Sequence, residues 1–249
     1  MLEFFKLKQP WKWAAFGKHP VAADYFAAGD PSPILNAFSS WVEKGYQSLK
    51  GDQTKAPWNS FRFWIKGPKK DLIMGTLHDS SDRIGRKFPL LIIGTGPLGN
   101  WEKKWEGLPS ALDKAWTRAE YLACKRYSEI KMLESDILAM PDPAAEGGLT
   151  EPPLEKKGWP SAFLGSDMDF KENLKSLLNN GKASFQTTWE SDSEGHSPLT
   201  GMHHLLKSKI GPLSPTAAFT TLASGKATVV LFRKPLTTDD FLYLVAAAK

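Results

Sequence analysis

The sequence GTLHDSSDRIGRKFPLLIIG spans Gly75 to Gly94 and joins two apolar runs through a short charged corner. The run that ends at Leu77 predicts a short strand, and the nearly continuous apolar run Phe88–Ile93 is typical of a strand buried on both faces. Between them, Asp and Ser side chains can bond nearby backbone amides, and Gly85 can adopt a positive φ. We therefore expect a rigid polar corner, carrying two acids and two arginines, beside a core strand.

Short strands flank this corner along the chain. Phe61–Ile65 and Leu72–Leu77 are separated by a turn that contains Gly67 and Pro68, which predicts a hairpin. Together with Phe88–Ile93 they indicate an antiparallel meander of three strands.

Further elements are indicated before and after the meander. Lys12–Gly17 predicts a first strand, and Ser32 followed by Pro33 is typical of a helix start. A capping-box pattern at Ser110 and helical apolar spacing from Leu112 to Ile137 predict one long helix. Later elements are a helix over 170–178, a strand over 183–189, a hairpin from 215 to 232 and a final helix over 241–248.

This order of elements indicates an α/β fold with a central mixed, partly antiparallel sheet and helices on both of its faces. We expect a single domain over 1–249. Residues at about 140–165 are rich in Pro and Gly, which indicates an irregular insertion in that domain. An interdomain linker is the alternative interpretation.

Composition limits the classes of function. The chain has 249 residues, a formal net charge of +5 and a pI of about 9.1. Its lysine clusters are short and lie among acids, which favours a solvated surface over a nucleic-acid site and is compatible with an acidic protein partner. Cys124 is the only cysteine and lies in a helical apolar pattern, so we expect a core residue.

The sequence gives no sign of export or membrane insertion. No stretch approaches the roughly 18 apolar residues of a membrane helix, and the first residues lack the pattern of a signal peptide. We expect a cytoplasmic protein.

No catalytic template is complete. The chain lacks a Gly-x-Ser-x-Gly elbow, a Walker A loop and a dinucleotide fingerprint. His196, His203 and His204 form a small histidine cluster, which we interpret as surface histidines because adjacent histidines rarely bind one metal together. We therefore expect no metal, no cofactor and no enzymatic activity.

Asp24, Asp82, Arg83 and Arg86 remain as candidates for chemistry. In a catalytic interpretation one carboxylate is a general base and the arginines bind an anion. In the alternative, the four form an internal ion-pair and turn-capping network, for which the bidentate geometry of arginine is well suited. We favour the network, and the sequence leaves open whether these residues also contact a partner.

Three stretches together resemble the TagF/ImpM family, the accessory proteins of bacterial type VI secretion. The first is GKHPVAADYF from Gly17, which is similar to a family pattern Gly-Lys-x-Pro-x-x-Gly-Asp-Phe, with Ala23 and Tyr25 as departures. It matches at Gly17, Lys18, Pro20 and Asp24. The second resembles Ser-x-Asp-Arg-x-Gly-Arg-x-Phe-Pro-Leu and matches at Ser80, Asp82, Arg83, Gly85, Arg86, Phe88, Pro89 and Leu90. The third is a weaker match at Pro235-Leu236 and Phe241-Leu242.

The resemblance implies a three-layer α/β sandwich and a post-translational repressor of type VI secretion. Proteins of this family are thought to bind the forkhead-associated scaffold protein of the system and to keep it from supporting assembly at the membrane. The implied partner is therefore that scaffold protein.

Two other classes of function stay open from the residues. An enzyme or binding protein could hold an anionic small molecule with Arg83, Arg86 and Lys18, and a basic nucleic-acid-binding module is a third possibility. The network hypothesis makes a geometric prediction. Asp82, Arg83 and Arg86 should lie near the loop from Lys18 to Asp24, with Phe88–Ile93 buried behind them.

Overall fold

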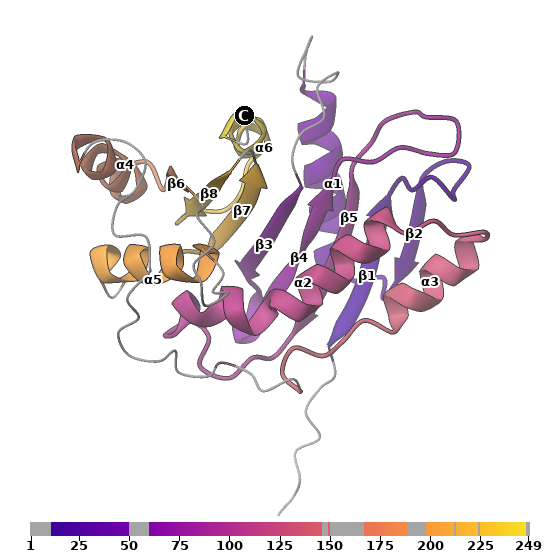
Figure 1. Cartoon of the computed structure of the whole chain (residues 1–249), viewed down its shortest axis with the longest axis horizontal. Helices are drawn as coiled ribbons and strands as arrows, with labels where there is room; N and C mark the ends of the chain where they lie inside the picture. Colours follow the sequence, from indigo (N-terminus) through magenta and orange to yellow (C-terminus); the bar gives the residue numbers. More distant parts are fainter. Residues whose placement is uncertain are drawn as a thin grey trace, which may run out of the picture.

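The computed structural model describes residues 11–49, 60–145, 149, 167–188, 198–211, 213–223 and 225–247. These residues form one eight-stranded sheet in the order β2-β1-β5-β4-β3-β7-β8-β6, with helices packed against it (Figure 1). The strands are β1 (Lys12–Gly17), β2 (Phe26–Gly29), β3 (Phe61–Lys66), β4 (Leu72–His78), β5 (Leu90–Gly96), β6 (Lys182–Thr188), β7 (Ala217–Ala223) and β8 (Lys226–Phe232). The helices are α1 (Pro33–Gln47), α2 (Leu108–Cys124), α3 (Ile130–Leu138), α4 (Asp167–Asn179), α5 (Pro198–Ile210) and α6 (Thr238–Ala247), with short 3₁₀ turns η2 (Pro68–Lys70) and η3 (Trp105–Gly107).

The α/β class is confirmed, but the prediction of a mixed sheet is wrong. Every neighbouring pair of these strands is antiparallel. The strands that α1 joins, β2 and β3, are not neighbours in the sheet. Neighbours are either hairpin partners or strands from distant parts of the chain.

The predicted meander is confirmed, since β3, β4 and β5 pair in succession. The third strand begins at Leu90 rather than at Phe88. Pro89 has no N–H to give to a ladder, and the N–H of Phe88 donates to the carbonyl of Ser80 at 3.0 Å. Phe88 and Pro89 therefore close the corner instead of extending the strand.

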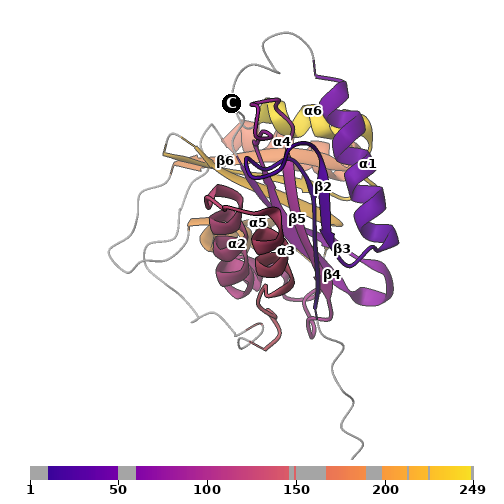
Figure 2. The same ribbon diagram turned by 90° about the vertical axis from the view of Figure 1, so that its right-hand side faces the viewer.

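Helices lie on both sides of the sheet, and the two sides have different cores. Figure 2 shows α1 on one side and α2, α3 and α5 on the other. On the α1 and α6 side the core is rich in phenylalanine, including Phe63 and Phe219. On the α2, α3 and α5 side it contains the fully buried tryptophans Trp64, Trp101, Trp105 and Trp116. Alternation along β3 explains the division, because Phe63 and Trp64 point to opposite faces.

Helix α1 confirms the predicted start. The hydroxyl of Ser32 accepts from the N–H of Leu35 at 3.2 Å, and Pro33 is the first helical residue. At its other end, Gly45 packs so closely on α6 that an added Cβ would lie 2.3 Å from a ring carbon of Phe241. Within the described parts of the chain, none of the helices combines the length and apolarity that a membrane crossing needs.

The single long helix predicted from Leu112 to Ile137 is wrong, because α2 ends at Cys124 and α3 begins at Ile130. The chain breaks so that Lys125 and Tyr127 can reach Asp136, each at 2.8 Å. Ser110 is not the cap either, since α2 starts at Leu108, directly after η3.

The break also explains why Cys124 is exposed rather than buried in the core, since it is the last residue of α2. The sequence did not predict α5, although its apolar residues Leu199, Met202 and Leu206 are buried. Of the predicted insertion, residues 140–145 contain no helix or strand, and most of the remainder lies outside the described residues.

Candidate functional site

The two sequence motifs meet because β1 and β5 are neighbours in the sheet. Gly17, the last residue of β1, pairs with Leu90 and has a φ of +131°. A Cβ on Gly17 would lie 2.0 Å from the carbonyl oxygen of Pro89, so no side chain fits there. The glycine of the first motif therefore allows β1 to end directly against the corner formed by residues 80–89.

The corner is closed by the carboxylate of Asp82. Its Oδ1 accepts from the backbone N–H groups of Ile84, at 3.1 Å, and of Arg86, at 2.9 Å. Two backbone hydrogen bonds also close the turn. The N–H of Asp82 donates to the carbonyl of Arg86, and the N–H of Gly85 donates to the carbonyl of Asp82. Gly85 has a φ of +85°, as the tight turn requires. The turn is rigid because side chain and backbone hold the same few residues.

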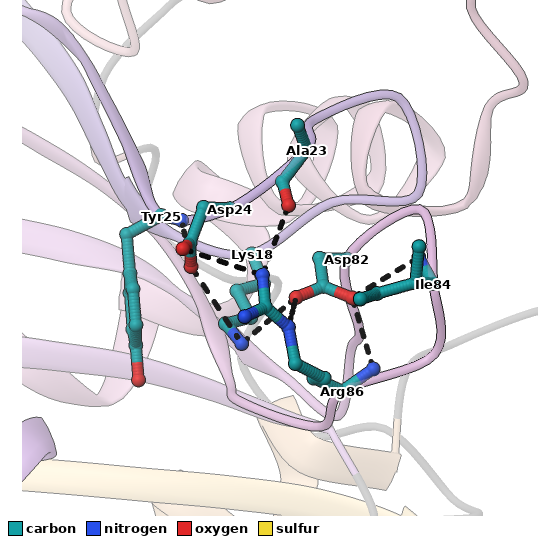
Figure 3. Close-up of polar contacts among 7 residues, drawn as sticks. All are labelled: Lys18, Ala23, Asp24, Tyr25, Asp82, Ile84 and Arg86. Atoms are coloured by element: carbon teal, nitrogen blue, oxygen red, sulfur yellow. Dashed lines mark hydrogen bonds and ion pairs between the residues drawn. The ribbon is translucent and has the colours of Figure 1, made fainter.

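The second oxygen of Asp82 joins the corner to the first motif (Figure 3). Oδ2 lies 2.9 Å from Nζ of Lys18 and 2.6 Å from Nε of Arg86. Arg86 also donates from Nη2 to the carbonyl of Ala23 at 3.0 Å and lies 3.3 Å from Asp24. Asp24 completes the ring at 3.9 Å from Lys18. This set of contacts, from here on the Asp82 network, confirms the predicted proximity of the two motifs.

Ala23 occupies the position of a glycine in the family pattern that the first motif resembles, and the structure accommodates the alanine. Ala23 is not among the residues with positive φ, so its methyl group causes no strain. Its carbonyl is the part that matters, since it receives the Arg86 guanidinium. The substitution therefore leaves the network intact.

Both members of the central pair are buried. Lys18 is 4% exposed and Asp82 is 2% exposed. Burial alone would raise the pKa of Asp82, but hydrogen bonds from Lys18, Arg86 and Ile84 outweigh it and hold that pKa well below the ordinary range. The bond to Asp82 in turn raises the pKa of Arg86. Asp82 is therefore a permanent anion with its oxygens already occupied, which is unsuited to a general base.

Aromatic rings support the buried ammonium. Nζ of Lys18 lies 4.7 Å from the centroid of the Tyr25 ring, a cation–π distance. The Tyr25 ring packs edge-on against Phe88, with centroids 4.7 Å apart, and stacks on Phe16. Tyr25 is nevertheless half exposed.

The loop after Lys18 turns around Pro20, which is exposed. The N–H of Ala22 donates to the carbonyl of His19 at 2.8 Å, and the N–H of Val21 donates to Nδ1 of His19 at 3.2 Å. His19 is buried against Tyr127, and burial lowers its pKa. Sequence reasoning gave His19 no role. Its place inside the first motif was the available signal.

Arg83 differs from Arg86 although both belong to the same motif. Its backbone N–H donates to the carbonyl of Ala22 at 2.9 Å, which fixes the corner on the loop. Its side chain is exposed and makes no ion pair or hydrogen bond with the described residues. The neighbouring Ile84 is 72% exposed. The corner therefore displays a free guanidinium and an apolar side chain.

Arg83 lines an open groove of about 670 Å³ between the first-motif loop and the start of α3. The other lining residues are Val21, Ala22, Ala23, Asp24, Tyr25, Phe26, Ser128, Glu129, Ile130 and Lys131. Sequence reasoning missed this groove because its walls come from three separate segments.

The proposed anion clamp of Lys18, Arg83 and Arg86 does not form as expected. Two of the three cations, Lys18 and Arg86, are bound by Asp82 and Asp24. Only Arg83 of this trio is free to meet a ligand. The structure thus separates one exposed arginine from an internally neutralised network.

A second buried carboxylate, Asp240, was missed by the sequence analysis. It is fully buried in the first turn of α6 and lies 2.7 Å from Lys182 and 3.1 Å from Lys234. It also accepts from the N–H and hydroxyl of Thr237. Nζ of Lys182 lies 4.8 Å from the centroid of the Tyr243 ring. Burial raises the pKa of Asp240, but these bonds outweigh it and lower that pKa. We call this set the Asp240 network.

The interpretation of the cluster as surface histidines is wrong for His203, which is fully buried. Nε1 of Trp64 donates to its Nε2 at 3.3 Å, and its Nδ1–H donates to the carbonyl of Leu199 at 2.8 Å. Burial lowers its pKa to about 4. His196 lies outside the described residues. Among those described, no group of three or more His, Cys, Asp or Glu is placed to hold a metal ion.

Comparisons with known proteins give the family of the segment that contains both motifs. Residues 14–136 match the family described as the TagF N-terminal domain, type VI secretion system-associated. This segment, just under half of the chain, belongs to that family. The chain is also similar to the solved structure of PA0076 from Pseudomonas aeruginosa, at 17% identity, covering 77% of this chain and 93% of that chain, with a TM-score of 0.42. No curated protein matches the chain.

Proposed function

We propose that this protein is an accessory regulator of a type VI secretion system, a post-translational repressor that binds the forkhead-associated scaffold protein and keeps it from supporting assembly. The family of residues 14–136 supports the link to type VI secretion. The repressor role and the scaffold partner come from the resemblance to TagF/ImpM proteins.

One observation supports action by binding: the motif divides its two arginines. Arg86 is ion-paired within the Asp82 network, whereas the charge of Arg83 is exposed beside a groove. A rigid corner that displays Arg83 and Ile84 matches the way interface residues are presented, since arginine anchors on preorganised backbone are frequent hot spots. In this proposal the protein works in the cytoplasm and needs no catalysis.

The test is capture of the purified cognate scaffold protein by the wild type, Arg83→Ala, Arg86→Ala and Lys209→Ala. Lys209 is exposed on α5, away from the motifs, and is the matched loss of one positive charge. We expect Arg83→Ala to lose most of the binding with an unchanged melting temperature, and Lys209→Ala to bind normally. Arg86→Ala should lower both the melting temperature and the binding.

A secretion assay completes the test. In bacteria that lack the gene, wild-type protein should reduce export of a type VI substrate, and Arg83→Ala at equal abundance should not. A wild-type protein that neither captures the scaffold nor reduces export contradicts the proposal.

A further inference from the structure

We infer that the groove beside Arg83 is the docking site for an extended acidic segment of the partner. Arg83 would pair with a carboxylate of that segment, and an apolar neighbour of the carboxylate would pack on Tyr25. This inference rests on the proposed function and deepens it by naming the surface and the chemistry that it recognises.

The charges that line the groove favour an acidic occupant. Asp24 is already matched by Arg86, at 3.3 Å, and by Lys18, at 3.9 Å. Arg83 and Lys131 have no carboxylate partner among the described residues, and Glu129 is the unpaired acid that lines the groove with them. With Asp24 paired, the remaining charges that line the groove are two positive and one negative, which leaves one positive charge in excess, and the whole chain is basic at +5.

The shape of the groove favours a chain segment over a small molecule. A pocket for a small ligand encloses most of that ligand's surface. This groove is open to solvent and is lined by the apolar side chains of Val21 and Ile130 as well as by charged ones. An extended segment with alternating acidic and apolar residues would place both kinds of side chain against their complements.

The surroundings make Arg83 a preorganised contact. Its backbone is held by the bond to Ala22, and the turn that carries it is closed by Asp82. Little backbone entropy is then lost on binding, which raises the contribution of each contact. Tyr25, half exposed and held by Phe88, offers a rigid aromatic surface beside it.

The experiment uses a set of overlapping 15-residue peptides from the cognate scaffold protein, with affinity measured by fluorescence anisotropy against the full chain. Peptides rich in Asp or Glu should bind, and versions with Asn and Gln in their place should not. Arg83→Gln should weaken the binding roughly tenfold and Lys131→Gln about threefold, as expected for a central and a peripheral charge. Glu129→Gln should instead strengthen it about twofold, because a like charge is removed.

The opposite signs separate a role of the groove from general loss of fold, and Lys209→Gln is the neutral control. Full-length scaffold captured equally by wild type and Arg83→Gln overturns the groove and leaves the proposed function standing. No capture of the scaffold by wild type overturns both. Binding of a free acidic metabolite in the groove, without any acidic peptide, would overturn the choice of a chain segment.

Discussion

The Asp82 and Asp240 networks are built from the same kinds of side chain at two distant points of the molecule. Each has a buried carboxylate with two cations on its side-chain oxygens, and each sets a lysine over a tyrosine ring, at 4.7 Å for Lys18 and 4.8 Å for Lys182. Each carboxylate also bonds a backbone N–H of its own turn. In this chain such a network therefore joins a strand end to a turn at two places.

The difference lies in what each network supports. The Asp240 network ties the edge strand β6 and the segment that follows β8 to the first turn of α6. The Asp82 network supports a turn whose tip is the exposed pair Arg83 and Ile84, beside a groove. We therefore expect Arg83 and Ile84 to be the residues that contact a partner, while the Asp82 network keeps their turn rigid.

The largest expected effect is that of removing a carboxylate. Asp240→Ala should lower the free energy of unfolding by about 3 kcal/mol, as for breaking a buried ion pair. Asp82→Ala should cost more, because the Lys18 side chain is 5% exposed and cannot turn to water, whereas those of Lys182 and Lys234 are 25% and 33% exposed. Urea unfolding measures both, with the exposed neighbour Asp239→Ala as control. Equal costs would remove the distinction between the two networks.

Substitution of the glycine beside the Asp82 network should also cost more stability than substitution of the glycine beside the Asp240 network. Gly17→Ala places a methyl group against the Pro89 carbonyl at φ +131° and should cost on the order of 3 kcal/mol or more. Gly181→Ala, at φ +72°, meets only flexible side-chain carbons of Lys234 at 3.2 Å and should cost about 1 kcal/mol. Thermal melts of the two variants give the comparison. A mild Gly17→Ala would show that β1 can shift away from the corner.

Mild acid should weaken the protein while leaving both carboxylate networks ionised. His203 has a pKa of about 4 in the folded protein and about 6.5 when unfolded. The unfolded state binds more protons between these values, so the free energy of unfolding decreases as the pH is lowered. At pH 5 the loss is about 2 kcal/mol. Burial lowers the pKa of His19, His78 and His204 as well, so these histidines should also reduce the free energy of unfolding in mild acid.

Urea unfolding at pH 7.5 and pH 5 of wild type and His203→Leu tests this, and the variant should lose less on acidification. Because the pKa values of Asp82 and Asp240 are lowered, their contributions should be lost only below about pH 4. If His203→Leu loses as much as wild type by pH 5, groups other than His203 titrate in this range.

The smallest expected effect is that of Arg83→Ala on stability, within about 0.5 kcal/mol, because the side chain is exposed and free of polar contacts with the described residues. Arg86→Ala should instead lower the melting temperature clearly, since it removes a bond to buried Asp82. Differential scanning calorimetry of the two variants separates the displayed arginine from the structural one. Equal losses would show that Arg83 also holds the fold.

Local patterns predicted what local physics determines. The Ser32 cap, the meander and the approach of the two motifs followed from turn residues, apolar runs and the charged corner beside a buried strand. The division between Arg83 and Arg86 did not follow, because the sequence presents two equivalent arginines. Only the position of the Ala23 carbonyl and Asp24 in space directs one of them inward.

Long-range contacts account for the features that were missed. Lys182 and Asp240 are 58 residues apart in the chain, and neither lies in a pattern that points to the other. The break between α2 and α3 depends on Asp136, which lies 11 residues beyond Lys125. The antiparallel sheet required knowing that β1 pairs with β5 and β3 with β7, which no turn specifies.

The unequal cores give the two sides of the sheet different optical labels. The fully buried tryptophans Trp64, Trp101, Trp105 and Trp116 all lie on the side of α2, α3 and α5, whereas phenylalanine fills the side of α1 and α6. Trp41 packs on the side of α1, but the other described tryptophans pack on the opposite side. The emission of the described tryptophans therefore reports mainly on one side, and far-ultraviolet circular dichroism reports on both. Coincident unfolding curves from the two signals would mean that the sheet couples its faces into one cooperative unit.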